Sequence, residues 1–265
     1  MILYLLKKNF CDGWDNMLSL IVPNIVMTLA SVALWALYGT VNASGNMALG
    51  MLFTLVFFAF FMALLFAFGE NAVRIANFGA GSVKDYFSQI VPCAKEGALF
   101  GLICGLFTIF ASVGIPYYMS LSRGGNMIGI FLASCVFWFV LIASLSLQWF
   151  IPIKMTLKDP FRVALKKSLF IFFDNPLLSL FMFVYHGIML FLSAFLLGSA
   201  PGATGILLSL SNALKILLYK YDYLEAHPEL KGRKRRNIPW SDLLKADKET
   251  LGPRSIRSFI FPWKD

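Results

Sequence analysis

The sequence predicts an all-α membrane protein, a polytopic bundle of six transmembrane helices with both termini on the cytoplasmic side. The first observation is composition: 58% of the 265 residues are hydrophobic and 14% are charged, with a mean hydropathy of +0.73. In soluble domains about a quarter of the residues are charged, so this surplus of apolar side chains needs an apolar solvent, which a bilayer supplies. The other two observations are a series of long apolar runs and the uneven placement of the basic residues.

Six stretches qualify as spans, because a helix needs roughly 20 apolar residues to cross a hydrocarbon core of about 30 Å. They are Leu18–Leu37, Met47–Phe68, Ala98–Tyr118, Met127–Ile151, Leu177–Leu197 and Ala203–Tyr219. The sixth stretch is short and contains the polar residues Ser209, Asn212 and Lys215. Hydropathy by itself therefore leaves open whether the chain crosses the membrane five or six times.

The distribution of Lys and Arg favours six crossings. Of the 23 basic residues, 22 lie before the first span, between spans two and three, between spans four and five, or from Lys215 onward. The remaining connections contain only Arg123. Because basic residues near span ends are retained on the cytoplasmic side, an even number of crossings with both termini inside satisfies every connection.

Three segments that mix apolar and charged residues precede spans one, three and five, near residues 1–14, 82–95 and 160–173. In the last segment, apolar residues recur at helical spacing while the basic residues fall largely elsewhere. This pattern is typical of an amphipathic helix in the membrane interface, with its basic side toward anionic headgroups. We expect an interfacial elbow helix at each place; a solvated loop or a cytoplasmic extension of the next span stays open as an alternative.

An internal repeat supports three elbow-plus-hairpin units. Leu6-Lys7-Lys8 is followed by Asp15-Asn16 and a span, and Leu165-Lys166-Lys167 is followed by Asp174-Asn175 and a span. The distance from Leu to Asp is nine residues in both copies, which lie 159 residues apart. Lys95-Glu96-Gly97 holds a similar place before span three. The repeat predicts that each pair of spans forms a hairpin entered through its own elbow.

We divide the chain into a transmembrane domain, residues 1–220, and a basic cytoplasmic tail, residues 221–265. The tail is expected to contain a short helix capped by Ser241 and ended by Gly252-Pro253. Nucleic-acid binding is not expected, because the basic run is short, tied to the membrane and without a fold signature around it. We expect the lipid bilayer and its anionic headgroups to be partners, although positive-inside anchoring also explains the basic run. The candidates for contact with anionic lipid are Lys166, Lys167, Arg233, Lys234, Arg235 and Arg236.

Three polar residues within the predicted spans, Asn24, His186 and Asn212, are candidate functional residues. Asn24, Thr28 and Ser31 share one face of span one, and Asn212 lies on a polar stripe of span six. Together with His186 they either line a polar pocket or only hydrogen-bond across packed helices, for about 0.6 kcal/mol each. No Asp or Glu lies inside a predicted span to pair with His186, so a proton-coupled pump is not favoured.

No pattern of a catalytic, cofactor or metal site is present. The sequence has no GxxxxGK[ST], HExxH or GxSxG motif. The four cysteines are scattered without a CxxC pair, which predicts free thiols that act as small apolar residues. No secretory signal peptide is visible before the first apolar run. The glycines from Gly101 to Gly105 have the small-residue spacing of a close helix contact.

The architecture resembles the YesL-like family of bacterial integral membrane proteins. The resemblance rests on Asp85-Tyr86-Phe87 through Lys95-Glu96 before span three, and on Phe150-Ile151-Pro152, Leu165-Lys166-Lys167-Ser168-Leu169 and Asn175-Pro176 before span five. It implies a protein without an established activity that accompanies sugar uptake and utilisation systems in bacteria. The long basic tail exceeds what is associated with that family.

The first functional hypothesis is a non-enzymatic protein of the bacterial cytoplasmic (inner) membrane that serves as an accessory or assembly partner of a transport system. The second is a small-solute or lipid transporter that uses a polar face between spans one, five and six, since repeats build many transporters. The second hypothesis predicts one cavity lined by Asn24, His186 and Asn212. A membrane-embedded enzyme is a distant third, because no catalytic pair is visible.

Overall fold

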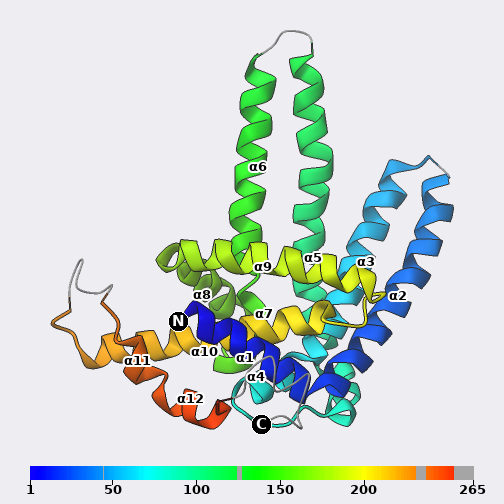
Figure 1. Cartoon of the computed structure of the whole chain (residues 1–265). Coiled ribbons are helices and arrows are strands. Elements are labelled where there is room, and N and C mark those ends of the chain that lie inside the picture. Colours follow the sequence, from blue (N-terminus) through cyan, green and yellow to red (C-terminus); the bar gives the residue numbers. More distant parts are fainter. Residues whose placement is uncertain (44, 124–126, 231–236, 254–265) are drawn as a thin grey trace.

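The computed structural model describes residues 1–43, 45–123, 127–230 and 237–253, and in these ranges every regular element is a helix (Figure 1). Six helices are long enough and apolar enough to cross a membrane. They are α2 (Met17–Ala43), α3 (Met47–Ala67), α5 (Val83–Ser122), α6 (Met127–Leu147), α9 (Pro176–Phe195) and α10 (Gly202–Ala226). The prediction of an all-α polytopic membrane helix bundle is confirmed.

Six shorter helices complete the described chain: α1 (Ile2–Asp15), α4 (Gly69–Ala76), α7 (Phe150–Leu157), α8 (Phe161–Asp174), α11 (Trp240–Leu243) and α12 (Lys245–Leu251). Two of the three expected elbows, α1 and α8, are separate helices. The segment 82–95 is different, because it continues without a break into the third span as the first turns of α5. For this segment the structure shows the alternative that the sequence left open, an extension of the next span in place of a separate elbow helix.

The repeat appears as the same hydrogen bonds at the ends of α1 and α8. Asn16 and Asn175 follow these helices, and each side-chain amide donates back to a carbonyl four residues earlier, at 3.0 Å and 3.2 Å. In both copies a serine at the start of the next helix donates to the asparagine carbonyl, from Ser19 at 2.8 Å and from Ser179 at 3.0 Å. The matching Asp-Asn dipeptides thus end one helix and begin the next, which makes the two elbows structurally equivalent.

The first two hairpins, α2–α3 and α5–α6, pack through a glycine stripe of α5 and then diverge toward their tips (Figure 1). A Cβ atom on Gly97 would lie 2.6 Å from the Ala63 Cα, and one on Gly101 would lie 2.2 Å from the Phe58 carbonyl oxygen. The backbones of α3 and α5 approach this closely only because no side chain intervenes. Close backbone approach through small residues is a main source of helix association in lipid.

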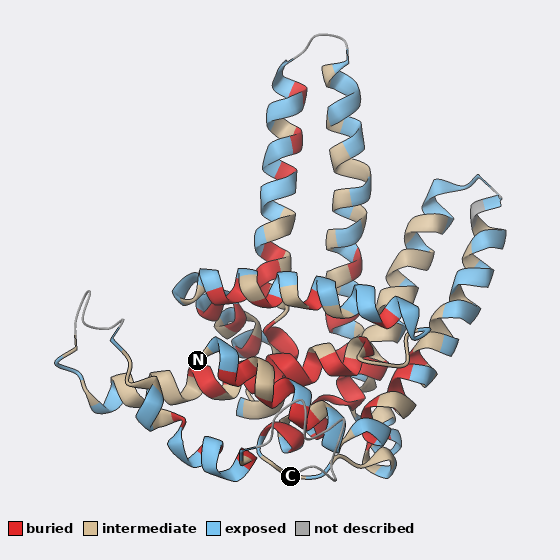
Figure 2. Ribbon diagram, in the orientation of Figure 1, coloured by how far each residue is buried: buried red, intermediate tan, exposed pale blue. Residues whose placement is uncertain are grey.

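The third hairpin has a different orientation. Figure 1 shows α9 and α10 running across the lower ends of the α5–α6 hairpin, and the turn between them packs against the first half of α2. In the apolar window of α10, 72% of the residues are buried, compared with 17–28% in the other five long helices. Figure 2 shows this contrast between a buried centre and exposed hairpins. The helix that hydropathy made doubtful is thus the central helix of the fold.

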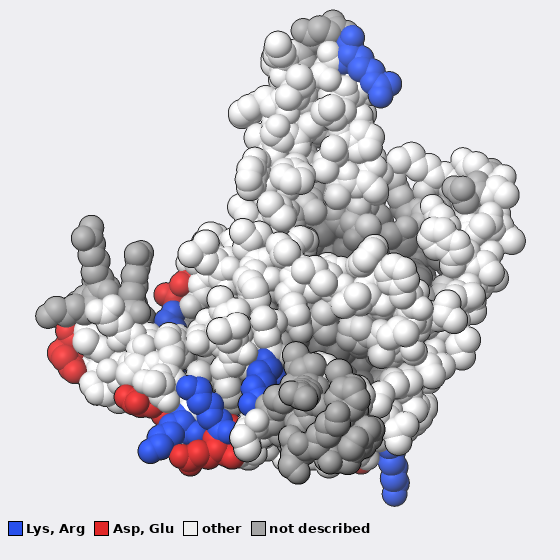
Figure 3. Space-filling view, viewed as in Figure 1, with Lys and Arg blue, Asp and Glu red and all other residues white. Residues whose placement is uncertain are grey.

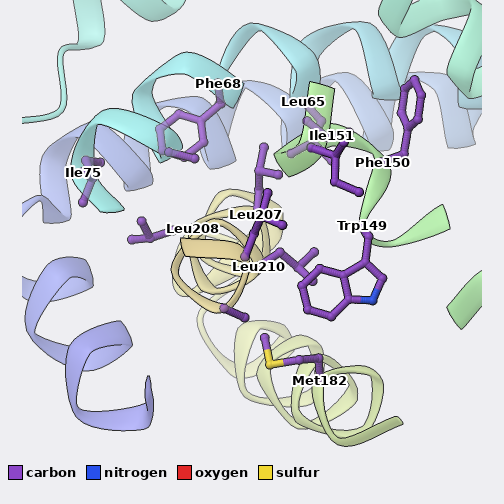
Figure 4. Close-up of a cluster of buried hydrophobic side chains, with 14 of the residues drawn as sticks. Leu65, Phe68, Ile75, Trp149, Phe150, Ile151, Met182, Leu207, Leu208 and Leu210 are labelled. Carbon is purple, nitrogen blue, oxygen red and sulfur yellow. The ribbon is translucent and has the colours of Figure 1, made fainter. Parts of the chain in front are cut away.

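A hydrophobic core surrounds α10. Leu207, Leu208 and Leu210 lie among side chains from the α3–α4 and α6–α7 junctions and from α9 (Figure 4). At the α6–α7 junction, Trp149 is fully buried and its indole nitrogen donates to the Ser179 hydroxyl at 2.8 Å. Phe150 stacks on a phenylalanine of α5 with ring centroids 4.4 Å apart. The short breaks after α3 and α6 turn aromatic side chains toward this core.

Charged residues gather at one end of the molecule. Figure 3 shows Lys, Arg, Asp and Glu concentrated in the lower part of the view, with an uncharged region above them. One basic group stands at the tip of the α5–α6 hairpin, where the described chain reaches Arg123. This separation agrees with a multi-pass membrane protein whose charged side faces one compartment.

The close contact of α3 and α5 leads to a first prediction. Gly101→Ala would place a methyl group against the Phe58 carbonyl, which only a shift of the α3 or α5 backbone relieves. Overpacking of this kind costs about 1–3 kcal/mol, so we expect a clear fall in the midpoint of thermal unfolding in detergent. Gly187→Ala is the matched control, since nothing lies within 4 Å of a Cβ atom at that helical position. Equal midpoints for the two variants would contradict the observed contact.

Candidate functional site around α10

The polar stripe of α10 begins with Asn212, which is fully buried. Its side-chain amide donates to the Asn9 oxygen and to the Asp12 carboxylate of α1, both at 2.9 Å. Lys215 and Tyr219 follow at three and seven residues, so they lie on the same side of the helix. The packing of α1 against α10 is therefore polar at its centre.

A buried ion pair lies within α1. The Lys8 ammonium is 2.8 Å from the Asp12 carboxylate, one helical turn away, and both residues are buried. The ammonium groups of Lys8 and Lys215 also lie 3.8 Å and 4.3 Å from the ring centroid of Phe78. Burial lowers the pKa of Lys8 against the opposing pull of Asp12, and burial raises the pKa of Asp12 against the opposing pull of Lys8. The interfacial helix predicted near residues 1–14 thus turns its charged pair toward the protein.

Asp247 of the tail completes this polar cluster. Its carboxylate accepts hydrogen bonds from the hydroxyls of Tyr219 at 3.1 Å and Tyr4 at 3.4 Å, and it pairs with the Lys215 ammonium at 3.1 Å. Leu244, just before α12, is 1% exposed. We call these contacts the tail latch, because Asp247 fastens α12 to both α1 and α10. Burial and the neighbouring Asp247 raise the pKa of Tyr4 above its usual value, so its hydroxyl keeps the proton that it donates.

The Asn24 side chain of α2 binds the backbone of the α9–α10 turn and of the start of α10. Its amide donates to the carbonyls of Ser199 and Pro201 at 3.0 and 2.9 Å, and its oxygen accepts from the backbone N–H of Thr204 at 3.0 Å. The side chain thereby fastens the α9–α10 turn and the N-terminus of α10 to α2. Gly202, at φ +60°, fits against it, since a Cβ atom there would lie 2.3 Å from the amide.

His186 lies in a third, separate place. Its Nε2 is 2.8 Å from the Ser209 hydroxyl, in the buried contact between α9 and α10. The three sequence candidates therefore belong to three different hydrogen-bonded sets, and the structure does not bring them together. Asn212 alone belongs to the polar cluster around α10.

The candidates for anionic-lipid contact differ among themselves. Lys166 is exposed on α8, whereas Lys167 pairs with Asp159 at 2.6 Å. Arg233, Lys234, Arg235 and Arg236 lie outside the described residues. On α8 the exposed side combines Lys166 with Phe170, which suits an interface that is part headgroup and part acyl chain.

Sequence reasoning missed Asp247, whose carboxylate contacts three side chains, and the ring of Phe78. The i, i+4 spacing of Lys8 and Asp12 was a usable signal for the ion pair, and the stripe from Asn212 to Tyr219 was a signal for the polar side of α10. No local pattern marks Phe78 or Asp247, because their partners are more than 25 residues away along the chain.

The chain was compared with models of protein families, with curated proteins and with solved structures, and none of the three comparisons found a match. The resemblance to the YesL-like family stays a prediction. In the described ranges, no group of three or more His, Cys, Asp and Glu residues is placed to hold a metal ion.

The buried ion pair leads to a second prediction. Asp12→Leu leaves the Lys8 ammonium buried without its counter-ion, and breaking such a pair typically costs about 3–5 kcal/mol. We expect a large loss of thermal stability in detergent for this variant. The double variant Lys8→Met, Asp12→Leu should recover most of it, because two apolar side chains replace two desolvated charges. A double variant no more stable than Asp12→Leu would show that the pair itself is not what matters.

The same variant should respond to pH in a defined direction. Without Asp12, burial is the largest remaining influence on Lys8, with smaller opposing effects of Lys215 and Asp247, and it holds the folded-state pKa of Lys8 below the ordinary value of 10.5. At a pH between the folded-state pKa and the unfolded-state pKa of Lys8, the unfolded chain binds more protons than the folded chain. The free energy of unfolding therefore rises with pH in that window. Thermal unfolding of Asp12→Leu from pH 7 to pH 10 should show this recovery more strongly than the double variant, which lacks the lysine.

Proposed function

We propose that this chain is a non-enzymatic multi-pass protein of a bacterial inner membrane that acts as an accessory or assembly partner of a transport system. Sugar uptake is the context that the resemblance to the YesL-like family implies. The observation that supports the proposal is the tail latch, which joins α1, the C-terminal half of α10 and α12 into one layer that we place on the cytoplasmic side. The buried charges of the latch order the surface formed by α1 and α12, and an ordered surface of this kind favours recognition by another protein.

The polar groups of the spans give the transporter hypothesis no comparable support. That hypothesis expected Asn24, His186 and Asn212 in one cavity, but each is bound to different partners within the protein. A polar pathway through Asn24, His186 and Asn212 would need the three side chains to face one common route. Asn24 instead holds the backbone of a turn, and His186 holds two helices together.

Lipid contact is part of the same proposal. The exposed face of α8 presents the basic residues Arg162 and Lys166 at its N-terminal end, and Phe170 and Phe173 beyond them. A helix of this kind gains from both anionic headgroups and acyl chains. It positions the cytoplasmic layer against the membrane surface, where membrane-bound partners are encountered.

The proposal predicts that the tail latch controls partner contact. Asp247→Ala removes the acceptor shared by Tyr4, Lys215 and Tyr219 and leaves the Lys215 ammonium without a carboxylate partner, so α12 should detach. A photo-crosslinking residue at exposed position Glu249 should form adducts with subunits of a transport complex in bacterial membranes. We expect Asp247→Ala to lower their yield about tenfold and to speed limited proteolysis between α10 and α12 by a similar factor.

Asp242→Ala is the matched control, because Asp242 is an exposed carboxylate of the same tail whose hydrogen bond is local, to Ser241. It should leave both adducts and proteolysis unchanged. Adducts with lipid only, or adducts of the same yield in both variants, would count against an assembly partner. If the Asp247→Ala variant were cleaved no faster than the native protein, the tail latch would not be what holds α12 in place.

A further inference from the structure

A cavity of about 410 Å³ lies where α2, α3 and the C-terminal end of α9 meet, beside the α9–α10 turn. Figure 1 shows the end of α9 reaching the two blue helices at this place. The volume falls in the range of small-molecule sites, about 300–1,000 Å³. The cavity is separate from the polar cluster around α10, and of the three intramembrane candidates only Asn24 is among its lining residues.

Within the described ranges, three hydroxyl groups of the lining make no hydrogen bond. They belong to Thr28 and Ser31, one turn apart on α2, and to Ser193 of α9, which is only 4% exposed. Serine and threonine hydroxyls in apolar helices normally donate to a carbonyl of the preceding turn, as Ser134 does here at 2.9 Å. The three cavity hydroxyls make no such bond among the described residues. They are therefore donors available to a bound molecule.

Apart from Asn24, the rest of the described lining is apolar and uncharged. Val32 and Trp35 of α2, Phe57 and Phe61 of α3, and Leu190 of α9 form most of it, and no Lys, Arg, Asp or Glu belongs to it. Val32 and Trp35 are 62% and 72% exposed, so the lining continues into the lipid-facing side of α2. A molecule dissolved in the bilayer can therefore reach the cavity without passing through water.

The wall on the side of the α9–α10 turn is fixed by two glycines. Gly198 and Gly202 have φ of +78° and +60°, and a Cβ atom on Gly198 would lie 2.4 Å from the Thr28 hydroxyl. Only glycine adopts this backbone conformation without strain. With the Asn24 hydrogen bonds, these residues hold the turn against α2 and leave the hydroxyls of Thr28 and Ser193 at the cavity.

We propose that this cavity binds a neutral amphiphile from the bilayer, a molecule with an apolar chain and an uncharged hydroxyl or ester oxygen. The oxygen accepts hydrogen bonds from Thr28, Ser31 and Ser193, and the chain lies along Trp35, Phe57 and Phe61. The absence of charge from the lining excludes an ionic headgroup from the cavity itself. Two sources share this chemistry, the glycerol-ester region of a diacylglycerol-type lipid and a free long-chain or isoprenoid alcohol.

The test uses the full chain in nanodiscs of phosphatidylglycerol, with a trace of a long-chain alcohol carrying a diazirine. After irradiation, the labelled peptides are identified by mass spectrometry. We expect saturable labelling of α2 and α9 near Trp35 and Leu190. Excess unlabelled diacylglycerol and excess unlabelled farnesol are the two competitors, and whichever competes at the lower mole fraction identifies the source. Labelling that is non-saturable and spread over the exposed face of α6 would overturn the proposal, as would the failure of both competitors.

The hydroxyl-free variant Thr28→Val, Ser31→Ala, Ser193→Ala keeps the shape of the cavity and should lose at least about tenfold in apparent affinity. Ser134→Ala, on α6, is the matched control and should bind as the native protein does. Native affinity in a monodisperse hydroxyl-free variant would overturn the role of the hydroxyls. If that variant does not fold, the single change Ser193→Ala is measured in the same assay with the same two outcomes.

Discussion

The fold depends on one constraint: the polar groups on one side of a buried helix take their partners from inside the protein, although the side-chain oxygen of Asn212 has none among the described residues. α10 carries an amide, an ammonium and a phenol on one stripe, and it is covered by α1, α4, α7 and α9. In a medium of low dielectric an unpaired polar group costs several kcal/mol. The partners of Asn212 are Asn9 and Asp12 of α1, and the partner of Lys215 is Asp247 of α12. These partners come from the two ends of the chain, so the constraint draws both ends to one helix.

The two halves of the molecule are stabilised in different ways. The hairpins α2–α3 and α5–α6 are exposed over most of their length. In lipid there is no hydrophobic driving force for helices to associate. They are joined by close backbone contact at Gly97 and Gly101. The part around α10 is packed like the core of a soluble domain, with stacked aromatic rings and fully buried side chains. The charged layer formed by α1, the C-terminal half of α10 and α12 belongs to this second part.

Polar residues within the long helices divide into two groups with different consequences. Asn24, His186 and Ser209 use their hydrogen-bonding capacity on the protein, so they hold helices and a turn in place. The hydroxyls of Thr28 and Ser193 do not, and they lie at a cavity continuous with the lipid-facing surface. A binding role follows from unused donors in an apolar setting, whereas the mere presence of a polar residue in a span indicates neither role. We therefore propose two separate functions, contact with a protein at the tail latch and binding of a lipid at this cavity.

The sequence by itself determined the class of the protein, the six long apolar helices, the equivalence of the two Asp-Asn elbows and the close contact at Gly101. Each of these follows from local composition or from spacing along one helix, which a linear pattern records. Only the tertiary structure decided that the sixth helix is the centre of the fold, that α1 turns Lys8 and Asp12 inward, and that Asp247 closes the cluster. These features depend on residues up to 243 positions apart. Such long-range pairings are chosen by the shared need to satisfy buried polar groups in three dimensions, and no local pattern of residues encodes that need.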